Sequence, residues 1–235
     1  MAKGLRMKSL SLVLVVAVAA MIGSAGPPDM TAVALISKVV SDVMRKSEGK
    51  EWSKAVRGET LISGDKIRTG GNSLAIIKFK DNSMVRVREL SELTITGDMV
   101  GKAFSKSVRL EQGVLGFNVR KQQPQEQFRF SSPTSVASIR GTRGQFVSQG
   151  LSDTLVVVEG MVVFQNVKSS QSVEVPAGST GISRPDGSIR TRPATPEELK
   201  AAEDVARVLD QDNQFELELR DSQGNRKKLK IDFQD

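Results

Sequence analysis

From Ala34 to about Ile182 the chain is a succession of short runs of β-forming residues separated by Gly, Asp, Asn and Ser. The run MVRVREL at 84–90 alternates Met and Arg with Val, which is the period of a strand with one face in water. The apolar run LAIIKFK at 74–80 comes just before it, and Asp81 and Asn82 stand between the two. Asp-Asn is suited to a tight turn, so the two runs predict a β-hairpin.

The same unit recurs further along the chain. In three places a run of β-forming residues reaches a glycine, at Gly113, Gly160 or Gly178, and apolar alternation resumes just beyond it. A glycine allows a positive φ or a bulge, so the chain can bend sharply without losing its pleat. Many short strands with tight corners predict a mainly β fold, arranged either as a short-strand β-solenoid or as a sandwich.

The pattern changes after Pro185. Residues 184–195 hold two prolines and a glycine, which is typical of a connector. The next residues predict a helix, because Thr195 can cap it, Pro196 suits its first position, and Glu198 completes a capping box. One apolar stripe of an amphipathic helix then contains Leu199, Ala202, Val205, Ala206 and Leu209.

The C-terminal residues predict a second hairpin. The runs QFELELR and KLKIDF both alternate, and the residues DSQGN lie between them as a turn. Alternation places one residue in two on a common apolar face, and we take these residues as a possible partner-binding patch: Phe215, Leu217, Leu219, Leu229, Ile231 and Phe233. A lone two-stranded hairpin is marginal in water, so the patch packs within the chain or on another protein.

The N-terminus has the order of a secretory signal. Three basic residues precede the apolar run 10–22, and the small residues Gly23, Ser24 and Ala25 follow it. We expect cleavage after Ala25 and localisation in the periplasm or elsewhere outside the cytoplasm. An uncleaved anchor is the alternative, although a membrane span takes about 20 apolar residues and this run is shorter.

The expected organisation follows from these boundaries. It comprises a signal peptide at 1–25, a short tether at 26–34, a β domain at 35–183, a linker at 184–195 and a helix-plus-hairpin appendage at 196–235.

Composition excludes several function classes. The chain has no His and no Cys, so Ser-His-Asp and Cys-His sites cannot be built, and zinc or haem lacks its preferred ligands. The formal net charge of +7 is spread along the chain rather than clustered, which argues against a nucleic-acid partner. We therefore expect no cofactor, no metal and no nucleic acid, with membrane contact only through an uncleaved signal segment.

The stretch GDKIRTGG at 64–71 raises the question of phosphate binding. A phosphate-binding loop needs its lysine after the glycines and a helix next, whereas here the lysine comes first and a strand follows. Gly and Asp are ordinary turn residues. We interpret the stretch as a turn at Gly64-Asp65, a short strand through Ile67, and a second turn at 70–72.

Carboxylates could in principle serve a hydrolase. The candidates are Asp65, Asp81, Glu89, Glu92 and Glu111. Most are expected at turns or on wet strand faces, where a solvated side chain is the default, so we expect no catalytic residue and no enzyme.

The stretch SIRGTRGQF at 138–146 could grip an anion through Arg140 and Arg143. The alternative, which we favour, is a bulge set by Gly141 and Gly144 with arginines that are solvated or paired with nearby acids.

Five segments in order resemble the FecR domain family. The first, GETLISGDKIRTGGNSLAIIKFKDNSMVRV at 58–87, is similar to the opening pattern of the family, with matches at Gly58, Leu61, Gly64, Asp65, Ile67, Thr69, Gly70 and Ser83. The others are LEQGVLGFNV, FSSPTSVASIRGTRGQFVS, VVVEGMVVF and VPAGSTG, so the resemblance runs from about Leu35 to Gly181. The chain departs from the family pattern in two places, at Pro133-Thr134 and at Arg143-Gly144.

The resemblance implies a role without catalysis. The best-known members combine a cytoplasmic anti-sigma segment, a membrane span and a periplasmic FecR domain that receives a signal from an outer-membrane transporter. Here fewer than ten residues precede the apolar run, so the chain resembles an exported, stand-alone FecR protein without the anti-sigma segment. We expect a protein-interaction or envelope signalling or scaffold module with an unidentified envelope protein as partner. The alternative is a module that binds an envelope polymer such as peptidoglycan or polysaccharide.

Overall fold

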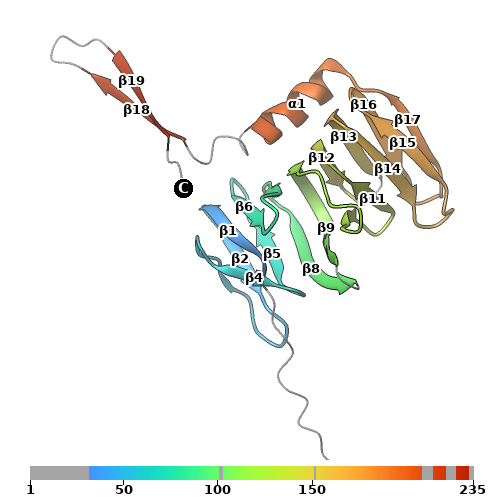
Figure 1. Cartoon of the computed structure of the whole chain (residues 1–235), viewed down its shortest axis with the longest axis horizontal. Coiled ribbons are helices and arrows are strands. Elements are labelled where there is room, and N and C mark those ends of the chain that lie inside the picture. Colours follow the sequence, from blue (N-terminus) through green and yellow to red (C-terminus); the bar gives the residue numbers. More distant parts are fainter. Residues whose placement is uncertain (1–31, 101–102, 151, 208–213, 221–225, 233–235) are drawn as a thin grey trace, which may run out of the picture. The chain divides into compact units, whose positions relative to one another are not determined.

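The computed structural model describes residues 32–100, 103–150, 152–207, 214–220 and 226–232 (Figure 1). The mainly β class expected from the sequence is confirmed. The first strands are β1 (Ala32–Val40), β2 (Val43–Lys46), β3 (Ser53–Lys54), β4 (Thr60–Ile62), β5 (Lys66–Thr69), β6 (Leu74–Phe79), β7 (Met84–Val87), β8 (Glu92–Val100) and β9 (Ala103–Val119). The later elements are β10 (Phe128–Ser131), β11 (Ser135–Ile139), β12 (Thr142–Ser148), β13 (Asp153–Glu159), β14 (Met161–Asn166), β15 (Ser172–Pro176), β16 (Ser179–Ser183), β17 (Ile189–Pro193), α1 (Pro196–Arg207), β18 (Gln214–Arg220) and β19 (Arg226–Asp232).

Strands β1 to β17 are joined by hydrogen bonds into one network with two layers. Sheet A has the order β4-β1-β6-β7-β9-β12-β13-β16-β17. Sheet B has the order β3-β2-β5-β8-β9-β10-β11-β14-β15. The chain passes back and forth between the sheets, usually one hairpin at a time. Of the two arrangements left open by the sequence, this is a sandwich.

Strand β9 belongs to both sheets. Its residues up to Gln112 pair with β8 in sheet B, and those from Gly113 onward pair with β12 in sheet A. Gly113 has a φ of 111°, and a Cβ there would lie 2.1 Å from Oγ of Ser91. Gly160 and Gly178 also have positive φ values. The expected bends at these three glycines are therefore present, and the one at Gly113 carries the chain across the core.

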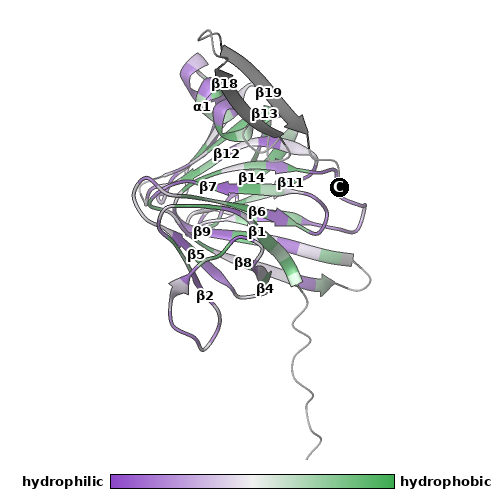
Figure 2. Cartoon of the chain, turned by 90° about the vertical axis from the view of Figure 1, so that its left-hand side faces the viewer, coloured by the Kyte–Doolittle hydropathy of each residue, from purple (hydrophilic) through white to green (hydrophobic). Residues whose placement is uncertain are grey.

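The hydrophobic core lies between the two sheets, and its phenylalanines connect them. Phe79 of sheet A meets Phe128 of sheet B with ring centroids 4.8 Å apart, and Phe117 of sheet A meets Phe130 of sheet B at 4.9 Å. Phe146, from sheet A, lies 6.4 Å from Phe130. The two-residue alternation of the strands thus has one side in this core, and Figure 2 shows hydrophobic and hydrophilic residues interspersed along the strands.

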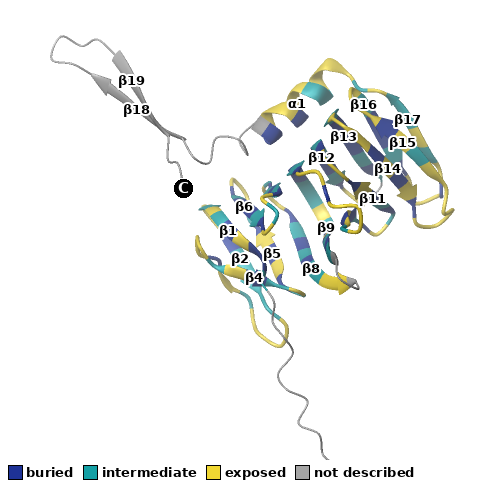
Figure 3. Ribbon diagram, in the orientation of Figure 1, coloured by how far each residue is buried: buried dark blue, intermediate teal, exposed yellow. Residues whose placement is uncertain are grey.

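Helix α1 begins with the capping box expected from the sequence. The N–H of Glu198 donates to Oγ1 of Thr195 at 3.2 Å, and the N–H of Thr195 donates to Oε2 of Glu198 at 2.9 Å. Ala202, Val205 and Ala206 are buried, so the helix has a buried and an exposed side (Figure 3). The helix packs on the outer face of sheet A over β9, β12 and β13.

Two expectations need correction at the ends of the β domain. Residues 32–34, expected in a tether, begin β1, and Val33 is fully buried because it faces the core. The expected connector contains β17, which pairs with β16. Gly187 has a φ of 102° within the turn that joins the two, and this turn makes a hairpin out of a proline-bearing sequence. The remaining domain boundaries stay predictions.

The C-terminal hairpin is present as an antiparallel pair of β18 and β19. The register places Phe215 opposite Ile231 and Leu217 opposite Leu229. The signal segment predicted at 1–25 lies outside the described residues. Among those that are described, no helix combines the length and the apolar character needed to cross a membrane.

Candidate binding surfaces

The loop at 64–71 is a structural corner, not an anion cradle. The N–H of Gly64 donates to the carbonyl of Ile95 at 2.8 Å, and the N–H of Gly70 donates to that of Asp42 at 2.9 Å. The N–H of Thr69 likewise binds a carbonyl, on Ser91. Since these amides already have acceptors within the chain, they are not left to bind phosphate, and the turn interpretation holds.

Most of the candidate carboxylates were expected to be solvated. Asp65 in this corner is not. Its side chain is fully buried and accepts from Nη2 of Arg45 at 2.7 Å and from the N–H of Ile62 at 2.8 Å. Arg45 also contacts Glu59. Arg45 comes from β2, the neighbour of β5 in sheet B, so the pair links the corner to the sheet edge. Because Arg45 lies 20 residues before Asp65 in the sequence, no local pattern around Asp65 indicated this ion pair.

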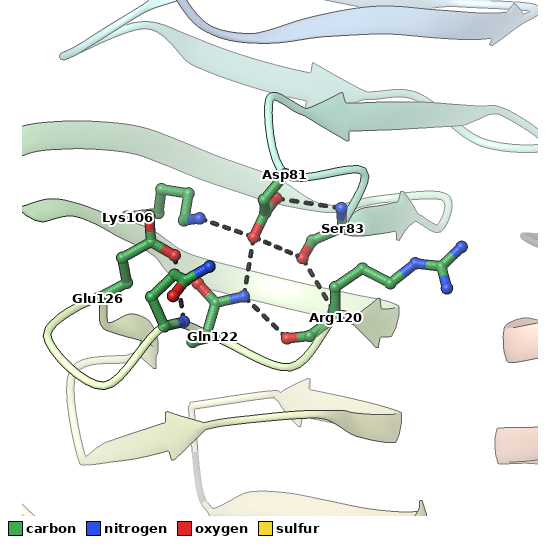
Figure 4. Close-up of polar contacts among 7 residues, drawn as sticks. Asp81, Ser83, Lys106, Arg120, Gln122 and Glu126 are labelled. Atoms are coloured by element: carbon green, nitrogen blue, oxygen red, sulfur yellow. Dashed lines mark hydrogen bonds and ion pairs between the residues drawn. The ribbon is translucent and has the colours of Figure 1, made fainter.

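Asp81 is the centre of a polar cluster in the turn between β6 and β7 (Figure 4). Its Oδ2 accepts from Nζ of Lys106 at 2.6 Å, from Nε2 of Gln122 at 2.8 Å and from Oγ of Ser83 at 2.9 Å. Burial disfavours the charge, but the hydrogen bonds from Lys106, Gln122 and Ser83 outweigh it, and the pKa of Asp81 is lowered from its usual value. The same Gln122 donates to the carbonyl of Arg120, so the cluster holds the loop after β9 in place.

Lys106 in this cluster was not recognised from the sequence. It is almost fully buried, because it shares the inward side of β9 with Val108 and Leu110. A basic residue at an apolar position of an alternating run is a usable signal for a buried ion pair. Nothing in the local pattern names its partner Asp81, which lies 25 residues earlier.

A second buried carboxylate, Asp153, was also missed. It accepts from the hydroxyl of Ser135 at 2.6 Å and also contacts the hydroxyls of Ser132 and Thr134. These hydroxyls come from the turn between β10 and β11 in sheet B, whereas Asp153 begins β13 in sheet A. The cluster therefore ties the two sheets together, as the Asp81 cluster does.

The remaining carboxylate candidates do not come together as one site. Glu92 pairs with Arg68 at 2.7 Å and Glu111 pairs with Arg109 at 2.7 Å, both on sheet B. Glu89 accepts from the N–H of Asn72 at 2.7 Å. Among the residues that the structure describes, no group of His, Cys, Asp and Glu could hold a metal ion.

Glu89 and Glu111 do share a groove beside α1. The groove is open, has a volume of about 790 Å³, and is lined by Arg88, Glu89, Leu90, Glu111, Gln112, Gly113, Val114, Gln145, Ser148, Gln149, Gly150, Ala201, Asp204 and Val205. Leu90 is 66% exposed and has a φ of 54°, which is unusual for a bulky residue. The N–H of Leu90 donates to the carbonyl of Gly70 at 3.2 Å, so the loop is held in this form.

The corner at 138–146 has the geometry that we favoured from the sequence. Gly141 has a φ of 63°, and the pairing of β12 with β13 shifts between Arg143 and Gly144, which is a bulge. Arg143 lies 3.7 Å from Glu159, and Arg140 is exposed. With these contacts, Arg140 and Arg143 do not point to one place where an anion could bind both.

A basic face covers part of the outside of sheet A. The register aligns Lys38 with Ile76 and Ile76 with Arg86, while Lys78 aligns with Met84. The outward positions of β1, β6 and β7, with the residue after β7, are Leu35, Lys38, Val40, Leu74, Ile76, Lys78, Met84, Arg86 and Arg88. We call these nine residues the basic face.

The cations of the basic face form no ion pair among the described residues, although Arg88 lines the groove together with Glu89, Glu111 and Asp204. The basic face holds four cations and no acidic residue. Nε of Arg86 is buried without a hydrogen-bond partner in that part of the chain. Burial, together with the charge of Arg88, lowers the pKa of Arg86 from its usual value. This surface therefore favours an acidic occupant.

The six residues predicted as a partner-binding patch fall in the C-terminal hairpin. Phe215, Leu217 and Leu219 lie in β18, and Leu229 and Ile231 lie in β19. Phe233 lies outside the described residues. The backbone register agrees with a common face, but the assignment of this patch to a partner stays a prediction.

Comparison with known proteins supports the sequence resemblance. Residues 65–163 match the model of a family described as FecR protein. Two crystal structures of a "putative anti-sigma factor" from Parabacteroides distasonis ATCC 8503 are similar to the chain, each with 13% sequence identity and a TM-score of 0.49. The similarity covers 58% of this chain and 63% and 62% of theirs, which is less than two thirds of their length.

No curated protein matches the chain. The family match covers the corner at Asp65, the Asp81 cluster, the crossing at Gly113 and the strands up to β14. The sequence resemblance to the FecR family is thereby confirmed over residues 65–163.

Proposed function

We propose that the protein is a non-enzymatic, extracytoplasmic module that acts through protein contacts, in envelope signalling or as a scaffold. The FecR family match supports a signalling-related role. The carboxylates of the described residues support the absence of catalysis, since Asp65, Asp81 and Asp153 are each held by neighbours that tie strands together.

The observation that carries the proposal is the register of the C-terminal hairpin. Phe215 opposes Ile231 and Leu217 opposes Leu229, while Glu218 opposes Lys228 on the alternate positions. Two strands that share an apolar face cannot bury it between themselves. The face therefore suits a partner protein that presents an apolar surface of its own.

The test is an affinity capture from envelope extracts with the processed protein, residues 26–235. We compare it with the variant Leu217→Gln/Leu229→Gln, which removes the central apolar pair. The matched control is Glu218→Gln/Lys228→Gln, which changes the neighbouring pair on the alternate face. We expect one envelope protein to be lost with the first variant and retained with the control.

Three results would count against this proposal. Recovery of the same proteins by both variants would move the contact away from the hairpin. Recovery of nothing beyond an empty matrix would remove the protein partner itself. Finding the unprocessed chain in the cytosolic fraction would refute the extracytoplasmic location, and intact mass gives that answer.

Binding of an envelope polymer is the second candidate, and the basic face favours it. Four cations that form no ion pair among the described residues would attract an anionic polymer such as peptidoglycan. Co-sedimentation with purified sacculi should then weaken as ionic strength rises, because salt screens exposed charges. Binding that is independent of salt, or unchanged in Lys38→Gln/Lys78→Gln, would exclude this candidate.

A further inference from the structure

We propose that the groove beside α1 binds a short extended segment of a partner protein in which basic residues flank an apolar one. The groove is lined by the loop after β7, the middle of β9, the end of β12 and one side of α1. None of these residues belongs to the C-terminal hairpin, so the inference goes beyond the proposed function. Three features of the groove support it: an apolar centre, an excess of acidic side chains, and glutamine amides that are free to bind.

The apolar part of the groove can bury a side chain of a partner. Val205 of α1 and Val114 of β9 line it together with Leu90. Among the described residues, no large hydrophobic side chain is more exposed than Leu90, at 66%. An exposed leucine in a concave surface beside other apolar side chains is typical of a binding groove. The volume of about 790 Å³ suits a short segment rather than a folded domain.

The chain holds Leu90 in this exposed position although its backbone conformation is unfavourable. A φ of 54° lies in the left-handed region, which disfavours a leucine. The hydroxyl of Thr69 fixes the loop, since it donates to the carbonyl of Arg88 at 2.6 Å and accepts from the N–H of Ser91 at 3.0 Å. The hydroxyl of Ser91 accepts from the N–H of Val114 at 3.0 Å. Because the loop is already fixed, binding at Leu90 requires little further ordering.

The charged side chains of the groove are mainly acidic. Its lining contains three carboxylates, on Glu89, Glu111 and Asp204, and one cation, on Arg88. Glu111 pairs with Arg109, but even with this second cation the acidic residues are in excess. Asp204 is exposed on α1 and forms no ion pair among the described residues. The whole chain has a net charge of +7, so the groove has the opposite sign and favours a basic segment.

Glutamine side chains complete the lining. Gln112, Gln145 and Gln149 line the groove, and their side-chain amides form no hydrogen bond within the part of the chain that the structure describes. Each amide can donate and accept, as the N–H and C=O groups of an extended chain require. A sugar polymer could use such amides too, but the described lining contains no aromatic side chain on which a sugar ring could stack. The groove therefore favours a peptide.

Three capped five-residue peptides serve as probes for the processed protein. The first has the sequence Lys-Leu-Lys-Leu-Lys, the second replaces each lysine by glutamate, and the third replaces each leucine by serine. NMR follows the backbone amide signals of Gly113 and Gly150, which line the groove, and of Gly49, which does not. We expect the first peptide to shift only the signals of the groove and to bind about tenfold more tightly than either control peptide, because each control lacks the charge or the apolar contact.

The variant Leu90→Gly separates binding from stability. Glycine adopts a positive φ without strain, so the midpoint of urea denaturation should stay the same or rise. The first peptide should nevertheless bind about tenfold more weakly, because the leucine side chain is gone. A lower midpoint with unchanged affinity would show that Leu90 serves the fold instead, and would overturn the proposal.

The variant Asp204→Asn tests the charge. It should weaken binding of the first peptide about threefold, whereas Glu197→Gln removes an exposed acid of α1 outside the groove and should leave the affinity unchanged. Equal losses in both variants would mean that the peptide responds only to the charge of the whole protein, and would overturn the proposal.

Two further outcomes would also overturn it. The first is equal binding of all three peptides. The second is a shift of the Gly113 and Gly150 signals by a tetramer of N-acetylglucosamine and not by the first peptide, since the groove would then be a sugar site. The hairpin is unchanged in every variant, so failure here leaves the hairpin contact untouched. A capture experiment in which the hairpin variants retain every protein likewise leaves the groove untouched.

Discussion

The outer faces of the two sheets share the same two-residue period but treat charge differently. On sheet B, Arg68 pairs with Glu92 across neighbouring strands and Arg109 pairs with Glu111, although Lys46 and Lys66, which are aligned in register, form no ion pair among the described residues. On sheet A, α1 covers one half, and none of the four cations on the other half forms an ion pair with a carboxylate of the described residues. Alternation places one side of each strand on the outer face of its sheet. The charges of the residues on that face decide whether it favours a binding partner.

The contact between the sheets should give the largest effect. Lys106 of sheet B reaches Asp81 in the turn between β6 and β7 of sheet A, and Lys106→Met would leave that carboxylate partly buried without its cation. We expect a loss of about 3 kcal/mol in the free energy of unfolding, measured by urea denaturation. Adding Asp81→Asn should recover part of the loss. A loss in the single variant no larger than in the double one would show that the two sheets do not depend on this pair.

The helix that distinguishes sheet A should give the next effect. Val205→Ala removes two buried methyl groups over Gly116, and we expect a loss of about 2 kcal/mol in unfolding free energy. Lys200→Ala, on the exposed side of α1, serves as the control and should change little. Equal losses for both variants would mean that the helix does not pack tightly on sheet A.

The capping box predicts a pH dependence for the same helix. The hydrogen bond from Arg192, with further bonds from Thr195 and Thr180, lowers the pKa of Glu198 from 4.5 to about 2. A lowered pKa means that Glu198 contributes stability above pH 4.5, and this contribution is lost as the pH falls toward 2. Glu198→Gln should reduce that part of the pH dependence. An unchanged profile in the variant would contradict the role of Glu198.

The smallest effect should come from sheet B. Arg68→Ala removes an exposed ion pair, and we expect a change of about 0.5 kcal/mol or less in unfolding free energy. Arg68 also lies 4.2 Å from the ring of Trp52, the only tryptophan of the chain. The fluorescence of Trp52 should therefore respond to the substitution even though stability hardly changes. A loss comparable to that of Val205→Ala would remove the contrast between the faces.

The sequence predicted those features whose causes are local. Gly113 and Gly160 could be recognised as bends because a positive φ favours glycine at that position whatever lies nearby. Thr195 and Glu198 define the start of α1 because a capping box needs only four consecutive residues. The hairpin of β6 and β7 followed from alternation and from the turn-forming pair Asp81-Asn82.

The features that could not be predicted depend on distant parts of the chain. Asp65 resembled a solvated turn residue, and only the approach of Arg45 from β2 explains its burial. Strand β10 pairs in parallel with β9, a pairing that alternation within either run does not specify. The basic face likewise appears only when the register aligns β1, β6 and β7.

The alternation of hairpins between the two sheets has a consequence for how such a protein can vary in length. Each hairpin adds two strands to one sheet and leaves an unpaired edge with which the next hairpin can pair. Whole hairpins could therefore be inserted without changing the path of the rest of the chain. The series of hairpins ends at β15 and β17, whose last residues are Pro176 and Pro193. A hydrogen bond connects the two strands, in which the hydroxyl of Thr191 donates to the carbonyl of Glu174. Proline cannot donate to a further strand, so this end of the molecule resists both elongation and stacking with another copy.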